Sequence, residues 1–141
     1  MQEAVLEEME QRILSEIEEA GEEDVCTLLN TVTATTGDAE EIEKFQAAVA
    51  VLIRAGFVRV AIDRDLTGRL RDQSSDASLD AIALLNSNVI YDKKHHVWKD
   101  IKEAGPPYED FYPYIVTTEA GQEKAFEILD ARGYQWWREK K

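Results

Sequence analysis

The chain has 141 residues, a formal net charge of −13 and a single cysteine, Cys26. This length is typical of one domain, so we expect residues 1–141 to form a single domain. One cysteine excludes an internal disulfide and a cysteine-rich zinc site. The chain has no apolar run of about 18 residues and no visible secretory signal, so we expect a cytoplasmic protein with no membrane partner.

The acidic surplus lies in the first third of the chain. Residues 1–43 contain fourteen acids and one base, Arg12, whereas residues 44–141 contain fifteen of each. A strongly acidic face repels nucleic-acid phosphates and anionic membranes at long range. The first third is therefore either a solvated face or a surface that favours a basic partner.

Two helices are predicted before residue 32. Apolar residues recur every three or four positions over residues 3–20, which is typical of a helix with one buried face, and Gly21 ends it. A shorter helix over about 23–31 begins with acids, which suit the positive end of a helix dipole. The polar and β-branched residues 31–37 predict a loop.

A longer third helix and a strand follow. Asp38, with Glu41 three residues later, resembles a capping box and predicts a helix that runs to about Ala55. Residues 57–62 place Val58, Val60 and Ile62 on one face, which predicts a strand.

The middle of the chain alternates between polar and apolar segments. Residues 63–75 predict a polar connector that contains three arginines: Arg64, Arg69 and Arg71. A fourth helix is expected over about 77–86, capped by Ser75 or Asp76. The pattern that follows predicts a β-hairpin whose tip is residues 92–96.

The last third predicts one strand and one helix. Residues 112–116 read as a short strand, and Pro113 indicates an edge position because proline cannot donate to a neighbouring strand. Thr118 is the expected cap of a helix over about 119–132, which Gly133 ends. Residues 134–137 are expected to be extended.

The order helix, short helix, longer helix, strand, later strand, helix resembles a winged-helix domain. Leu52-Ile-Arg-Ala-Gly56-Phe-Val resembles the third helix of such a domain running into its first wing strand. Tyr114-Ile-Val-Thr-Thr-Glu-Ala-Gly121 is similar to the strand-to-helix step of multiple-antibiotic-resistance-type regulators, in which the glycine permits close packing. The resemblance covers residues 1–62 and 111–133, and it treats residues 63–110 as an insertion. It implies an α+β fold with a winged-helix-like helical core, a small antiparallel sheet, and an inserted helix and hairpin.

The start of the third helix departs from that family. A winged helix usually reads the DNA major groove from the N-terminal end of this helix. Four carboxylates occupy that end here, and they would oppose phosphates: Asp38, Glu40, Glu41 and Glu43. We therefore predict a non-enzymatic module that mediates protein–protein interaction through an acidic surface. Such a surface favours another protein of basic character as the partner.

The alternative is a DNA-binding transcriptional regulator of the winged-helix type. The connector arginines Arg64, Arg69 and Arg71 are the best candidates for nucleic-acid contact, because wings touch phosphate. Three acids in the same stretch bring its net charge to zero: Asp63, Asp65 and Asp72. DNA is expected as a partner only under this alternative.

No residue pattern indicates catalysis or a metal. His95 and His96 are adjacent and lie beside Asp92 and two lysines, which is typical of a solvated hairpin tip. Cys26 lies among apolar residues, which indicates a buried small side chain rather than a nucleophile. No nucleotide-binding, zinc-protease or hydrolase motif occurs, so we predict no enzyme activity, no cofactor and no metal site.

Aromatic residues gather at the end of the chain. Tyr134, Trp136 and Trp137 either close the core or form an exposed interface, since tryptophan and tyrosine are enriched at interfaces. The second interpretation, together with the winged-helix resemblance, predicts a homodimer.

Overall fold

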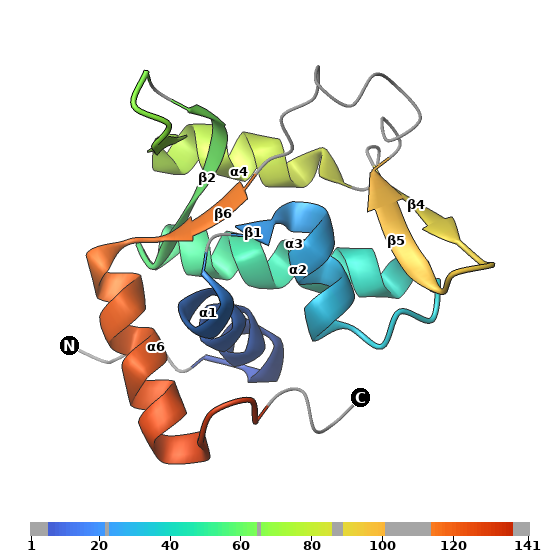
Figure 1. The fold of residues 1–141 in the computed structure, drawn as a ribbon, viewed down its shortest axis with the longest axis horizontal. Coiled ribbons are helices and arrows are strands. Elements are labelled where there is room, and N and C mark those ends of the chain that lie inside the picture. The colour runs from blue at the N-terminus through green and yellow to red at the C-terminus, as the bar shows by residue number, and fades with distance from the viewer. Residues whose placement is uncertain (1–5, 22, 65, 86–88, 101–113, 137–141) are drawn as a thin grey trace.

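The computed structural model describes residues 6–21, 23–64, 66–85, 89–100 and 114–136, which fold as an α+β protein, as predicted (Figure 1). The elements, in chain order, are α1 (Glu8–Ala20), β1 (Glu23–Asp24), α2 (Val25–Val32), α3 (Ala39–Arg54), β2 (Val58–Arg64), β3 (Leu70–Asp72), α4 (Ser75–Ala83), β4 (Val89–Asp92), β5 (Val97–Asp100), β6 (Tyr114–Thr117) and α6 (Glu119–Arg132).

The first two helices begin later than their apolar patterns predict, because side chains cap them at other positions. In α1, the backbone N–H of Glu7 donates to the carboxylate of Glu10 at 2.9 Å, which completes a capping box at Glu7. In α2, the carboxylate of Asp24 accepts the backbone N–H of Thr27 at 2.9 Å. Glu23 and Asp24, predicted as the start of this helix, instead form β1.

A four-stranded antiparallel sheet has the order β1-β6-β2-β3. Strand β6 therefore pairs on both sides, and the predicted edge position is wrong; Pro113 itself lies outside the described residues. The predicted connector 63–75 also needs correction, because Leu70–Asp72 return along β2 as strand β3. Both errors concern strands of two to four residues, whose pairing depends on distant segments.

The remaining elements match their predictions closely. The hairpin pairs β4 with β5, with Asp92 opposite Val97 across the predicted tip. The exception is the start of α4, where the predicted cap, Ser75 or Asp76, is wrong. The cap is Ser74, whose hydroxyl accepts the backbone N–H of Ala77, so the helix begins at Ser75, about two residues earlier than predicted. In α6 the Thr118 hydroxyl accepts the backbone N–H of Gly121 at 3.1 Å and donates to the Gly56 carbonyl at 2.6 Å.

Apolar side chains from α1, α2, α3, β2, β6 and α6 form a hydrophobic cluster. The segment predicted as an insertion contributes to the same cluster through Ile82, Leu85, Val89 and Trp98. Figure 1 shows α1 beside α6, with the β4–β5 hairpin at the opposite side of the molecule. Gly121 allows α6 to approach the start of β2, because an added Cβ would overlap the carbonyl oxygen of Phe57.

Candidate functional site

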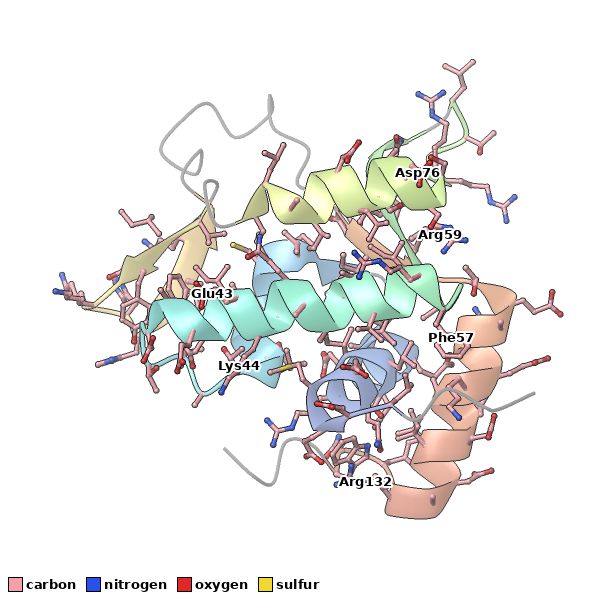
Figure 2. The ribbon with its side chains drawn as sticks, turned by 180° about the vertical axis from the view of Figure 1, so that it is seen from behind. Glu43, Lys44, Phe57, Arg59, Asp76 and Arg132 are labelled. Carbon is pink, nitrogen blue, oxygen red and sulfur yellow. The ribbon has the colours of Figure 1, made fainter. Side chains whose placement is uncertain are left out.

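Helix α3 lies between α1 and α4 and turns one long side to solvent, toward the viewer of Figure 2. Its inner side is buried in the core, with Phe45, Val49 and Leu52 fully covered. The residues that point outward are all exposed, and we call them the α3 face: Glu40, Glu43, Lys44, Ala47, Val51 and Arg54.

The α3 face is graded along its length. Its first half carries three charged side chains, Glu40, Glu43 and Lys44. Its second half carries the apolar side chains of Ala47 and Val51, and its last turn carries Arg54. Val51 is 39 % exposed, which makes it one of the large apolar side chains that solvent reaches. Within the described ranges, the four charged side chains of this face make no hydrogen bond or ion pair with another residue. They are therefore available to a partner.

The four predicted acidic residues have different roles in the structure. Glu40 and Glu43 are exposed, whereas the Asp38 carboxylate accepts the backbone N–H of Glu40 at 2.9 Å as the cap of α3. Glu41 is half-buried, and its Oε1 accepts the backbone N–H groups of Thr36 at 2.9 Å and Gly37 at 3.2 Å. Glu41 thus reaches past the expected capping-box position and stabilises the preceding loop. Of the four acids, only Glu40 and Glu43 are exposed and make no side-chain hydrogen bond among the described residues.

The β4–β5 hairpin packs against the start of α3. The indole Nε1 of Trp98 donates to Glu41 Oε1 at 3.1 Å, and the Tyr91 hydroxyl donates to the Thr35 carbonyl at 2.6 Å. The Tyr91 ring lies so close to Gly37 that an added Cβ would contact it at 2.7 Å. A side chain from the predicted insertion therefore covers the loop in front of α3.

Asn30 of α2 binds the backbone of strand β5 in this hairpin. Its side-chain amide donates to the Trp98 carbonyl at 2.8 Å and accepts the Trp98 backbone N–H at 2.7 Å. The amide thus pairs with the backbone of β5 as a neighbouring strand would. The hairpin is consequently held to both α2 and α3.

A cleft of about 230 Å³ lies beside the start of α3. Arg12 and Lys44, the first two bases of the chain, both line it, as do three acids and three apolar side chains: Asp38, Glu40, Glu41, Met9, Val32 and Ala34. The Arg12 guanidinium already binds the Glu8 carboxylate at 3.2 Å and the Val32 carbonyl at 3.3 Å. Neither histidine nor cysteine lines this cleft, and its opposing charges favour no single class of ligand.

The predicted nucleic-acid arginines come together on the β2–β3 hairpin. Arg64 pairs with Leu70 in the backbone register, and Arg69 and Arg71 lie on the returning strand and its approach. The side chains of Arg69 and Arg71 are exposed. This hairpin projects at one edge of the sheet, away from the β4–β5 hairpin (Figure 1).

The predicted aromatic interface is wrong for Trp136. This side chain is 6 % exposed, and its indole Nε1 donates to the Ser15 hydroxyl of α1 at 2.9 Å. The Arg132 guanidinium lies 3.5 Å above its ring centroid. Trp136 therefore closes the core, and residues 134–136 form a turn rather than the expected extended segment. Tyr134 is exposed, and Trp137 lies outside the described residues.

The tip of the β4–β5 hairpin holds a cluster of three charged or ionisable side chains: Asp92, His95 and Lys99. His95 Nδ1 lies 2.6 Å and Lys99 Nζ lies 2.9 Å from the Asp92 carboxylate. The hydrogen bond from Lys99, followed by that from His95, holds the pKa of Asp92 well below its usual range. Within the described residues, no group of three or more potential metal ligands is brought together.

Cys26 is half-buried, with its sulfur 3.9 Å from the Trp98 carbonyl oxygen. It packs against the hydrophobic cluster, as its apolar neighbours in the sequence predict.

The apolar and basic parts of the α3 face were missed in the sequence. The signal was present, because Glu40, Ala47 and Arg54 recur every seven residues and so lie along one side of a helix. The acids were predicted as a surface, but the rest of this exposed stripe, opposite the buried one, was not.

Comparison of the chain with protein-family models, with curated proteins and with solved structures finds no match. In the part of the chain that the structure describes, no helix combines the length and apolar character that a bilayer crossing requires.

Proposed function

We propose that the chain is a non-enzymatic protein-binding module with winged-helix-like architecture, which docks a basic contact surface of another protein on the α3 face. The observation that carries this proposal is the exposure of Glu40 and Glu43 without intramolecular partners, on the same side of α3 as the exposed apolar side chain of Val51. Interfaces combine an apolar centre with charged groups that select the partner.

The winged-helix part of the proposal is supported by connectivity. Helices α1, α2 and α3 precede β2, and β2 pairs directly with β6, the two strands that the resemblance assigns to the wing. Val60 faces Ile115 in that pairing, and both are fully buried. Residues 63–110 would then be an elaboration between the two wing strands.

Two observations favour a protein partner over DNA on this face. Glu40 and Glu43 would meet phosphate with like charge, since the family reads DNA from this end of its third helix. The β4–β5 hairpin, which covers Gly37 in front of α3, would also have to fit against the DNA major groove.

A fluorescent lysine-rich peptide and a random-sequence DNA duplex test this proposal by fluorescence anisotropy at several salt concentrations. We expect the wild type to bind the peptide with an affinity that falls as salt rises, and not to bind the duplex. E40K/E43K should weaken peptide binding by about tenfold.

The matched control is E119K/E123K, because these two acids are exposed at the start of α6 and raise the net charge by the same amount. This control should bind the peptide almost as the wild type does. Equal weakening by both double variants would show that only net charge matters, and the α3 face would then have no special role.

The DNA-binding alternative is favoured by one observation, the exposed Arg69 and Arg71 on the β2–β3 hairpin. Under it, the duplex would bind with a clearly negative slope of log affinity against log salt, and R69E/R71E would reduce that slope.

A further inference from the structure

The α3 face has opposite charge at its two ends. Glu40 and Glu43 lie in the first half of the helix and leave it net negative despite Lys44 beside them, and Arg54 lies in the last turn. Arg59 adds a second positive charge to the C-terminal end, because its Nη1 donates to the carbonyls of Ile53 at 3.2 Å and Val58 at 2.8 Å. Figure 2 shows Arg59 near this end of α3 and Glu43 near the other.

Ala47 lies midway between the charged ends. Glu40 and Arg54 are each seven residues from it, so the two charges are separated by about 21 Å along the helix axis. A two-fold axis through Ala47 would set Glu40 of one copy opposite Arg54 of the other, and symmetry would repeat this pair at the far end.

We infer that the α3 face docks a second copy of this chain, with the two α3 helices antiparallel about an axis at Ala47. This inference rests on the proposed function, since it takes the α3 face as the docking surface and identifies its basic partner as the other copy's Arg54 and Arg59. The small side chain of Ala47 permits close approach of the two helices. Val51 of each copy lies one helical turn from the axis, one on each side of it. Antiparallel helix dipoles add to the attraction.

Charge complementarity selects a second copy over other occupants. A lysine-rich partner can pair with Glu40 and Glu43 at the start of the helix, but it meets Arg54 with like charge at the other end. A polyanion meets the opposite conflict. The other copy satisfies both ends at once. One helix pair buries less than the roughly 1,200 Å² of a stable interface, so the self-association is weak and sensitive to salt.

Sedimentation velocity of the full chain over a wide concentration range tests this inference. We expect reversible dimerisation at about 0.15 M salt, where a Debye length of about 8 Å screens the net charge of −13 on each copy. The dimer should be lost at about 1 M salt, where the Debye length is about 3 Å. E40R or R54E alone should weaken dimerisation by about tenfold, because each replaces two attractive pairs by two repulsive ones. Far-UV circular dichroism checks that both variants keep their helices.

Two further experiments restore the attraction between positions 40 and 54 of the two copies. An equimolar mixture of E40R and R54E should form heterodimers, because each charge then meets its opposite, and the double variant E40R/R54E should dimerise by itself. E123R on α6 serves as a charge-matched control and should dimerise as the wild type does.

Two outcomes would overturn the inference: a wild type that stays monomeric at about 0.15 M salt, or dimers that E40R and R54E leave intact. Peptide binding on the α3 face without self-association would overturn only the identity of the partner and leave the proposed function standing. Self-association that follows the charge swaps, without peptide binding, would support the second copy as the specific partner.

Discussion

The indole of Trp98 and the carboxylate of Glu41 form a 3.1 Å hydrogen bond across 57 positions of the sequence. The same carboxylate oxygen accepts two backbone N–H groups from the loop before α3. This single atom therefore joins the β4–β5 hairpin, the loop and the helix.

Replacement of Glu41 by alanine should lower the free energy of unfolding by about 1–3 kcal/mol, because three donors lose their acceptor at once. Urea denaturation measures this change. Glu40→Ala is the control: it removes an exposed carboxylate one residue away and should leave stability within about 0.5 kcal/mol. Equal effects of the two variants would contradict the role of Glu41 as the link.

Trp136→Ala should destabilise the fold by about 3–5 kcal/mol, since it removes a buried indole and leaves a cavity against α1. Thermal unfolding followed by circular dichroism gives the loss. Tyr134→Ala changes a neighbouring aromatic residue that is 69 % exposed, and it should have little effect. A stable W136A variant would mean that the C-terminal turn does not close the core.

Gly121→Ala should destabilise the protein by about 1–3 kcal/mol, although alanine is the better helix former by about 1 kcal/mol. The added methyl group would overlap the Phe57 carbonyl oxygen, and backbone cannot move aside as a side chain does. Gln122→Ala, at an exposed position in the same turn, should be neutral in the same urea titration. A gain in stability from G121A would show that α6 and β2 are further apart than the structure places them.

Stability should fall in acid partly through Glu8. Burial alone would raise its pKa, but the hydrogen bonds and charges of Arg132 at 3.0 Å and Arg12 at 3.2 Å outweigh burial, so the pKa lies below its ordinary value of 4.5. A carboxyl group whose pKa is lower in the folded state stabilises the fold above its unfolded pKa. This contribution is lost as the pH falls through the folded pKa.

Urea titrations between neutral pH and about pH 3 measure this dependence. Glu8→Gln should be less stable than the wild type at neutral pH, and the difference should shrink in acid. Glu18→Gln is the control, because Glu18 lies on the same helix and its side chain makes no hydrogen bond or ion pair with another described residue. A constant difference across the pH range would contradict the contribution of the two arginine pairs.

Local signals predicted the helices well, because their causes lie within a few residues. Thr118 capped α6 and Gly133 ended it as expected, and Asp38 opened α3. The start of α2 was misplaced by two residues, because Asp24 capped the helix instead of joining it. In each case the outcome depended on which side-chain oxygen accepted a backbone N–H.

Features that depend on distant partners could not be predicted. Strands β1 and β3 contain two and three residues, and both exist only because they pair with β6 and β2. The burial of Trp136 depends on Ser15, at the other end of the chain. The acidic surface was predicted by residue type, but only the packing of the hairpin separated Glu41 from Glu40 and Glu43.

The position of β6 has a consequence for synthesis of the chain. Strands β1 and β2 are translated well before β6, the strand that lies between them in the sheet. A ribosome-bound chain that ends before Tyr114 would hold two short strands without the neighbour that bridges them. Assembly of the sheet is therefore expected to wait until residues Tyr114–Thr117 have left the ribosome.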